Sequence, residues 1–373
     1  IFNTIFFYNQ SSYAVYAENI NCINVGDNTY YVVKKASKTK TGKLVLIRCN
    51  STKGKIKISG EVTYKKQKYK VIGISNNYDD FYIDEYVFNP TVKEVILPDT
   101  LTFLGDSVFY NCTNLKQIDI PKTVKSIGYA AFWGSGLKEV TIPDGVKSIG
   151  NSAFKYCTEL VKAVIPGSVI TIDNLAFINC SSLKSVELSE GIESIGRMAF
   201  TNCSELESIV LPNSIKKLDE AVFYGNLNLK TVKLPDKITH ISKMLFLMSG
   251  LEEITLPDSI ETIGSNAFSS SKVSFTALPK NLKSIESDAF SLCTNLTDLT
   301  IPDEVEYIGD KAFWGCYNLK HITIPPSVKI IGKDAFLGCA LGSGADGISG
   351  ITGKQGSLAE QIAKEMNITF NAR

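Results

Sequence analysis

Histidine, tryptophan and methionine are scarce in this sequence of 373 residues, which contains two, two and four of them. The histidines, His240 and His321, lie far apart and in no HExxH-type spacing, so they do not form the zinc motif of a metallohydrolase. The nine cysteines include no CxxC pair, which argues against a cysteine zinc site or a thioredoxin-type centre. No nucleophile–base constellation, phosphate-binding loop or paired carboxylates stand out. We therefore expect no metal, no cofactor and no enzymatic activity.

Long apolar runs and an excess of one charge are also missing. No run reaches the roughly 18 apolar residues that a transmembrane helix needs, so no membrane span is expected. The 39 basic and 38 acidic side chains leave a formal net charge of +1. The net charge of the whole chain therefore does not indicate any class of binding partner. We do not expect nucleic acid as a partner, because no recognition motif appears.

What the sequence does contain is a repeat. Phenylalanines recur at gaps of 22 or 23 residues, and ten of the twelve prolines recur with them at one position of the repeat. The phenylalanines are Phe109, Phe132, Phe154, Phe177, Phe200, Phe223, Phe246, Phe268, Phe290, Phe313 and Phe336. Such regularity predicts eleven structural repeats stacked into a solenoid, because one unit of this size cannot bury its apolar side chains alone.

One clean copy runs from Leu137 to Cys157. Its first segment ends in Val140 and Ile142 with a polar residue between them, as a strand with one buried face should. The proline that follows has no N–H to donate and ends the strand. A second short apolar stretch comes next, then Gly150, for which we expect a tight turn with positive φ.

The residues of this copy match a known family. The pattern L-x-x-I-x-I-P-x-x-V-x-x-I-G-x-x-A-F-x-x-C closely resembles the BspA-like bacterial leucine-rich repeats, from about Lys55 to Arg373. The resemblance implies a β-rich α/β repeat fold, a right-handed leucine-rich-repeat solenoid with a parallel β-sheet on one face. It also implies a secreted or surface-anchored protein, since several members adhere to host proteins or other cells. Departures at the proline or glycine positions, which put local turn geometry in doubt, are Ser189, Asp173, Asp219, Ser242 and Glu286.

The ends of the array require caps. Residues 1–17 are interpreted as a signal-peptide remnant, a first strand or a disordered tail, and residues 18–90 as an N-terminal β cap with a degenerate first repeat. The eleven repeats occupy residues 91–340. Residues 341–373 are expected to form a loop, a capping helix that starts with the capping box Ser357-x-x-Glu360, and a last strand at 368–370, with a floppy tail as the alternative. In that helix Leu358, Ile362 and Met366 are expected to share one face.

A basic segment lies in the predicted N-terminal cap. Between Lys34 and Lys70 there are thirteen lysines or arginines and one acid, Glu61, a local net charge of +12. Lys55, Lys57, Lys66, Lys68 and Lys70 alternate with other residues, so several of them are expected to share one sheet face. One interpretation is a patch for an anionic polymer such as cell-wall polymer, sulfated glycan or phospholipid. The other is a solvated edge that resists aggregation. The candidate patch comprises Lys34, Lys35, Lys38, Lys40, Lys55, Lys57, Lys65, Lys66, Lys68 and Lys70.

The third and fifth residues of each strand segment should be exposed and form a second candidate surface. This row is mixed and mostly polar, and it includes Phe275 and Ala277 in one repeat. A protein ligand on this face and plain solvated surface are both open. The candidate binding residues are Glu94, Gln117, Asp119, Glu139, Thr141, Lys162, Glu187, Thr231, Lys233, Glu253, Asp298 and His321.

Three smaller patterns complete the candidates. Tyr110, Trp133, Tyr224 and Trp314 follow the repeat phenylalanine and form either a binding edge or cover for the interior. Seven cysteines, from Cys112 to Cys339, share one repeat position and are expected to be buried free thiols, whereas Cys22 and Cys49 are better placed to pair. The triplets at Asn111, Asn179 and Asn202 fit glycan acceptors formally, but the repeat turn itself explains them.

Together these patterns favour a secreted or cell-surface binding or adhesion protein that presents its repeats to a protein or glycan, of the host or of another cell. The alternative is a structural, cell-wall-associated spacer that uses the basic patch. Catalysis is the least favoured hypothesis. The identity of the ligand and the oligomeric state stay open.

Overall fold

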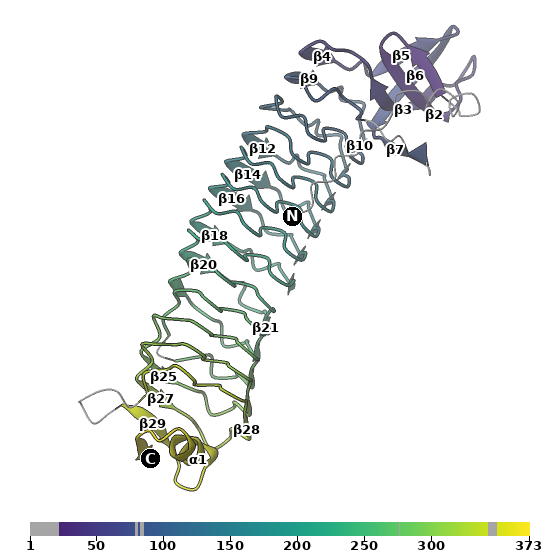
Figure 1. The fold of residues 1–373 in the computed structure, drawn as a ribbon. Coiled ribbons are helices and arrows are strands. Elements are labelled where there is room, and N and C mark those ends of the chain that lie inside the picture. The colour runs from purple at the N-terminus through teal and green to yellow at the C-terminus, as the bar shows by residue number, and fades with distance from the viewer. Residues whose placement is uncertain (1–21, 79–80, 83–85, 276, 342–348) are drawn as a thin grey trace.

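The computed structural model describes residues 22–275 and 277–373, apart from 79–80, 83–85 and 342–348. The chain winds into an elongated solenoid with a β cap at its N-terminal end and the helix α1 at its other end (Figure 1). The proposed signal remnant at 1–17 lies outside the described residues. The leucine-rich-repeat solenoid predicted from the sequence is confirmed.

Two rows of parallel strands run along the solenoid, where one was expected. The strand-face row follows the segment before each proline and lies on one side; the opposite row follows the second apolar stretch of each repeat (Figure 1). The strand-face row is made of β4 (Lys55–Lys57), β9 (Glu94–Ile96), β12 (Glu139–Thr141), β14 (Lys162–Ile165), β16 (Ser185–Leu188), β18 (Ser208–Val210), β20 (Thr231–Lys233), β22 (Glu253–Ile254), β25 (Asp298–Thr300), β27 (His321–Thr323) and β29 (Gly350–Gly353).

The opposite row consists mostly of two-residue strands. It continues from β6 (Gln67–Ile74) of the cap, which pairs with β10, so cap and solenoid share one sheet. Its other members are β10 (Phe103–Leu104), β11 (Ser126–Ile127), β13 (Ser148–Ile149), β15 (Thr171–Ile172), β17 (Ser194–Ile195), β19 (Lys217–Leu218), β21 (His240–Ile241), β23 (Thr262–Ile263), β24 (Ser284–Ile285), β26 (Tyr307–Ile308) and β28 (Ile330–Ile331).

The repeat phenylalanines fill the space between the two rows. Each ring stacks on the ring of the next turn, with centroids between 4.9 Å for Phe154–Phe177 and 6.1 Å for Phe200–Phe223. Phe88, which the repeat count left out, begins this ladder against Phe109 at 5.1 Å. All are buried, and burial of one such side chain stabilises the fold by about 1.5–3 kcal/mol.

Gly150 has a structural role, but not the one expected. Its φ is not positive; the left-handed residue of that turn is Ser152, at φ 58°. A Cβ on Gly150 would lie 2.7 Å from the carbonyl carbon of Gly128, so the close approach of these two turns favours glycine here. The departures at this position keep the turn, since Asp173 N–H donates to Ile149 O at 3.0 Å as Gly150 N–H donates to Ile127 O at 2.9 Å.

The N-terminal cap is a twisted sheet in the order β1–β2–β3–β6. The strands β1 (Cys22–Val25), β2 (Asn28–Lys34) and β3 (Gly42–Cys49) are antiparallel, β3 pairs with β6 in parallel, and β5 (Glu61–Tyr64) makes a hairpin with β6. A short hairpin of β7 (Asn77–Tyr78) and β8 (Phe81–Tyr82) lies where the repeat pattern loosens. Strand β4 lies within the segment 18–90 that was expected to form the cap and a degenerate first repeat; it pairs with β9 and so belongs to the first turn of the solenoid.

The C-terminal cap contains the expected helix, α1 (Leu358–Glu365), and the last strand, β30 (Phe370–Ala372). The helix begins after Ser357 as expected, but the capping box itself does not form. The Ser357 side chain makes no capping bond, and Glu360 accepts the N–H of Gly356, one residue before the N-cap, at 2.7 Å. Leu358, Ile362 and Met366 pack partly buried against the core, and the fully buried helix residues are alanines. Part of the expected 341–356 loop is strand β29, which pairs with β27 and β30.

Candidate binding surfaces

The strand face, formed by the third and fifth side chains of the strand-face row, is polar and ordered in ladders. Glu139 lies beside Lys162 and then Ser185 in register, and Thr141 beside Val164 and Glu187. Every candidate residue of this face is exposed or half-buried, as expected for a surface row. Gln117 and Asp119 are exposed too, but their segment forms no strand.

Charges on the strand face are paired between turns. Lys162 Nζ lies 2.6 Å from Glu187 Oε1, and Glu94 Oε1 lies 2.7 Å from Lys55 Nζ. The hydrogen bond to Glu187, together with the charges of Glu187 and Glu139, raises the pKa of the Lys162 ammonium. These pairs are open to solvent and contribute little to stability, so they leave the face able to exchange partners.

A depression of about 590 Å³ lies on the strand face across β18, β20 and β22. The predicted residues Thr231, Lys233 and Glu253 line it, and Asp236 and Val210 add an acid and an apolar side chain. Val210 is 61% exposed although it is β-branched and apolar. One hollow therefore combines both charges, a hydroxyl and an uncovered apolar side chain, which suits a protein surface better than a small metabolite.

The strand face is interrupted after β22, where one expectation fails. Phe275, expected to be exposed, is buried edge-on between Phe268 and Phe290, at centroid distances of 5.7 and 6.0 Å. Ala277 is exposed as expected and keeps a single bridge to Thr300. β22 and β25 belong to separate sheets, and the buried Phe275 lies in the segment between them.

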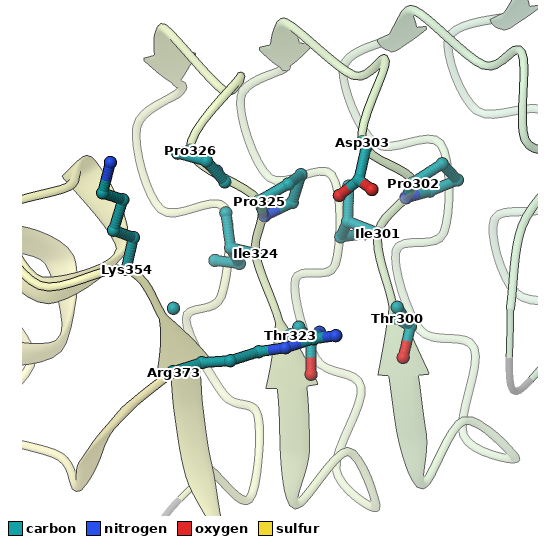
Figure 2. Close-up of a pocket in the computed structure, with 11 residues that line it drawn as sticks. Thr300, Ile301, Pro302, Asp303, Thr323, Ile324, Pro325, Pro326, Lys354 and Arg373 are labelled. Atoms are coloured by element: carbon teal, nitrogen blue, oxygen red, sulfur yellow. The ribbon is translucent and has the colours of Figure 1, made fainter.

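A second depression, of about 440 Å³, lies at the C-terminal end of the strand face. Figure 2 shows the Arg373 side chain beside Thr323, with Thr300 on the neighbouring strand and Lys354 and Asp303 at the rim. Nearby, a ring nitrogen of His321 lies 2.7 Å from Thr352 Oγ1, while Asp298 Oδ1 lies 4.0 Å from the other. The repeat pattern had no means of placing Lys354 and Arg373 here, because both belong to the cap.

The basic candidates divide between two sheets. Lys55 and Lys57 stand on β4 in the strand-face row, whereas Lys68 and Lys70 stand on β6 of the cap sheet. Lys65 and Lys66 form the two-residue turn of the β5–β6 hairpin, and Lys35, Lys38 and Lys40 lie between β2 and β3. All ten are exposed. Lys68 and Lys70 share one face of the cap sheet and Lys55 and Lys57 share one face of β4, so the alternating lysines occupy two sheets and not a single face.

An aromatic row covers the N-terminal turns beside the phenylalanine ladder. Tyr86, Tyr110, Trp133 and Tyr156 follow one another with centroids 5.6–6.1 Å apart. The Lys155 ammonium lies 4.2 Å from the Trp133 ring centroid. Tyr110 and Trp133 are half-buried, as are Tyr224 and Trp314 farther along, which agrees with their interpretation as cover.

All nine cysteines are free thiols, so the pairing considered for Cys22 and Cys49 does not occur. Cys22 lies opposite Tyr31 on β2 and Cys49 opposite Asn28, at different ends of the strands. The repeat cysteines are buried or half-buried, and several donate to the carbonyl of the preceding repeat phenylalanine, as Cys157 does to Phe132 O at 3.0 Å.

The asparagines of the three Asn-Cys-Thr/Ser triplets occupy a left-handed turn position, which accounts for their recurrence. Among the residues that the structure describes, no cluster of histidine, cysteine and acidic side chains is arranged to hold a metal ion. Nor does the described part of the chain contain a helix with the length and apolar character needed to cross a membrane.

The chain matches the family model described as BspA type leucine rich repeat region (6 copies). The matched segments are residues 81–190, 147–274 and 226–342. No curated protein matches the sequence significantly. Among solved structures, a leucine-rich repeat protein from Bacteroides ovatus is similar at 22% identity and a TM-score of 0.52, covering 89% of this chain and 100% of its own.

Two further structures are similar over most of their length. A leucine rich cell surface protein from Faecalibacterium prausnitzii is 22% identical, with a TM-score of 0.44, and covers 92% of this chain and 97% of its own. The pneumococcal vaccine antigen PcpA is 17% identical, with a TM-score of 0.47, and covers 94% of this chain and 98% of its own.

Proposed function

The chain belongs to the BspA-type leucine-rich repeat family, and from that premise we propose that it is an extracellular or cell-surface protein that binds a macromolecule without catalysis. The observation that carries the proposal is the strand face over β12 to β22, a long polar surface on a continuous interior. Rigid strands hold its side chains in place, so little ordering entropy opposes binding.

We assign the contact to the depression lined by Thr231, Lys233 and Glu253. The uncovered Val210 supplies apolar area, and the two charged side chains supply orientation. A folded protein partner fits this mixture, since interface cores combine apolar contacts with a polar rim. Membership of the BspA-type family supports a location at the cell surface.

The test is capture on immobilised extracellular-matrix proteins and on whole bacterial cells, with the triple variant Thr231→Ala, Lys233→Ala, Glu253→Ala compared with the unchanged chain. Loss of a central contact region should lower the affinity by about tenfold or more, as for hot-spot residues. The matched control, Lys147→Ala with His240→Ala, alters exposed residues at the opposite row and should bind as the unchanged chain does. Equal capture by the triple variant and the unchanged chain would show that this part of the strand face does not bind the partner.

A further inference from the structure

The parallel pairing of β3 with β6 brings together two lysine-rich segments that are separate in the sequence. Gly42 lies opposite Tyr69 and Lys43 opposite Lys70, so the start of β3 and the connection before it meet the β5–β6 hairpin. Nine lysines gather at this end of the cap, and residues 34–43 and 61–70 together carry a net charge of +8. We call the nine the lysine surface: Lys34, Lys35, Lys38, Lys40, Lys43, Lys65, Lys66, Lys68 and Lys70.

Part of the lysine surface is an in-register row of like charges. Lys34 lies opposite Lys43, Lys43 opposite Lys70, and Lys70 opposite Glu61, across β2, β3, β6 and β5. Directly opposed side chains on adjacent strands have Cβ atoms about 5 Å apart, and like charges there destabilise the sheet. The repulsion between these lysines destabilises the folded cap. Their presence therefore needs an explanation other than stability.

Protection of a sheet edge is not that reason. Lys43 and Lys70 stand on strands with neighbours on both sides, in the order β2–β3–β6 with β5 beyond. Edge lysines work by occupying a strand whose backbone would otherwise be open to another chain. That explanation suits Lys55 and Lys57 on β4, which among the described strands pairs with β9 alone, but it does not suit the lysine surface.

The lysine surface differs from parts of the solenoid in that its charges form no ion pair with the described residues around them. Several lysines of the repeats pair with carboxylates of neighbouring turns, as Lys216 does with Glu193, Lys283 with Glu261 and Lys329 with Glu306, at 2.8 Å each. In the described part of the chain none of the nine lysines has an ion-pair partner, although all nine are exposed. A ligand with many negative charges would supply the missing counter-charges.

The amino-acid composition of the lysine surface limits the class of ligand that it can bind. All nine cations are lysine, a point charge without the planar fork by which arginine recognises a group bidentately. The adjacent rings are occupied, since Tyr69 is buried and the Lys65 ammonium lies over Tyr64 at 5.4 Å, so bases and sugar rings find no stacking platform. Among described residues 22–77, no large hydrophobic side chain is exposed to enter a lipid surface.

We propose that the lysine surface of the N-terminal cap binds a flexible linear polymer of the polyol-phosphate class, with one phosphodiester charge per unit. A flexible polymer can place successive charges over lysines on three strands, on the β2–β3 connection and on the hairpin tip. The surface lies at the opposite end of the solenoid from α1 (Figure 1), so the polymer holds one end and leaves the strand face accessible.

The test measures the Kd of the full chain for purified poly(glycerol phosphate) at several salt concentrations. The cap variant K34Q/K43Q/K68Q/K70Q should bind about tenfold or more weakly, and its slope of log Kd against log salt should fall by about 2–3, at roughly 0.7 per lost contact. The control K147Q/K184Q/K237Q/K272Q removes the same charge from exposed repeat positions and should bind within about twofold of the unchanged chain.

Comparison ligands at matched charge are heparin, oligothymidylate and vesicles with phosphatidylglycerol. Weaker binding of all three supports the assignment; equal or tighter binding of any one overturns it, as does an equal loss in the control variant. The melting temperature of the cap variant should stay level or rise, because like-charge repulsion is removed. If that variant fails to fold, K35Q/K38Q/K40Q tests the same surface outside the strands, and unchanged binding then refutes the proposal.

The result is independent of the strand-face proposal. The triple alanine variant at Thr231, Lys233 and Glu253 should bind poly(glycerol phosphate) as the unchanged chain does. Loss of polymer binding in that variant would place the polymer on the strand face and overturn the lysine surface.

Discussion

At the scale of single residues, the fold depends on how closely successive turns approach. Gly150 shows this, because its nearest neighbours are backbone atoms of the preceding turn at 2.7–2.9 Å from an added Cβ. At two turns where the position holds another residue, the side chain hydrogen-bonds a backbone group: Asp219 Oδ1 accepts the Glu220 N–H at 2.9 Å, and the Ser242 hydroxyl donates to Leu218 O. A polar side chain is tolerated at this position because its hydrogen bond to the backbone offsets the cost of the closer packing.

Gly150→Ala is therefore expected to destabilise the protein by roughly 1–3 kcal/mol, the usual cost of overpacking a tight interior. The matched control is Gly54→Ala, where the nearest atom to the new Cβ is a lysine side-chain carbon at 3.6 Å. Urea unfolding followed by circular dichroism measures both. Equal stability of the two variants would show that the turns separate without cost.

At the scale of elements, each turn is held by the rings above and below it. Phe200 lies 5.2 Å from Phe177 but 6.1 Å from Phe223, the widest step of the ladder, and this step lies near the boundary between the β12–β14–β16 and β18–β20–β22 sheets. The break after β22 coincides with a different feature, the burial of Phe275. These two sheet breaks of the strand-face row thus lie beside irregularities in the packing of the rings.

Phe200→Ala should lower the free energy of unfolding by about 3–5 kcal/mol, the range for a buried phenylalanine. The ring is fully buried in mid-array, so its removal leaves a cavity between two turns that the rigid ladder fills poorly. Tyr156→Ala is the comparison, since that ring is 46% exposed and should cost much less. Near-wild-type melting of Phe200→Ala would contradict an interior ladder.

At the scale of the whole molecule, the interior is one continuous cluster from the N-terminal cap to α1. Buried cysteines in several different turns belong to this cluster. Burial raises the pKa of the Cys112, Cys203 and Cys293 thiols to about 12. Ionisation is therefore favoured in the unfolded chain, and the contribution of these thiols to stability is present below about pH 8.5 and is lost as the pH rises toward 12.

At pH 8 the repeat thiols of the folded protein should react with a disulfide reagent orders of magnitude more slowly than free cysteine, because they are both protonated and buried. In denaturant all nine cysteines should react at the rate of free thiols. Mass spectrometry of the modified positions at intermediate denaturant distinguishes the modes of unfolding. Simultaneous labelling of Cys112, Cys203 and Cys293 indicates one cooperative unit, and labelling that advances from one end indicates stepwise loss of turns.

The resemblance and the spacing together predicted the solenoid, the buried phenylalanine ladder, the free repeat thiols and the helical cap, because each depends on local periodicity. The second row of strands was missed since two-residue strands such as Ser148–Ile149 carry too little alternation to be recognised. Phe275 was misplaced because the pattern assigns a position by counting, whereas the ring follows the space left between Phe268 and Phe290.

The sequence alone determined which side chains repeat and hence which must stack, since a fixed period along the chain becomes a fixed position in every turn. It also showed that thirteen basic residues crowd one segment. Only the tertiary structure decided that Lys43 meets Lys70 on inner strands while Lys57 joins the first turn of the solenoid. Strand pairing across a connection of this length is non-local, so it is set by the packing of the whole cap and leaves no periodic trace in the sequence.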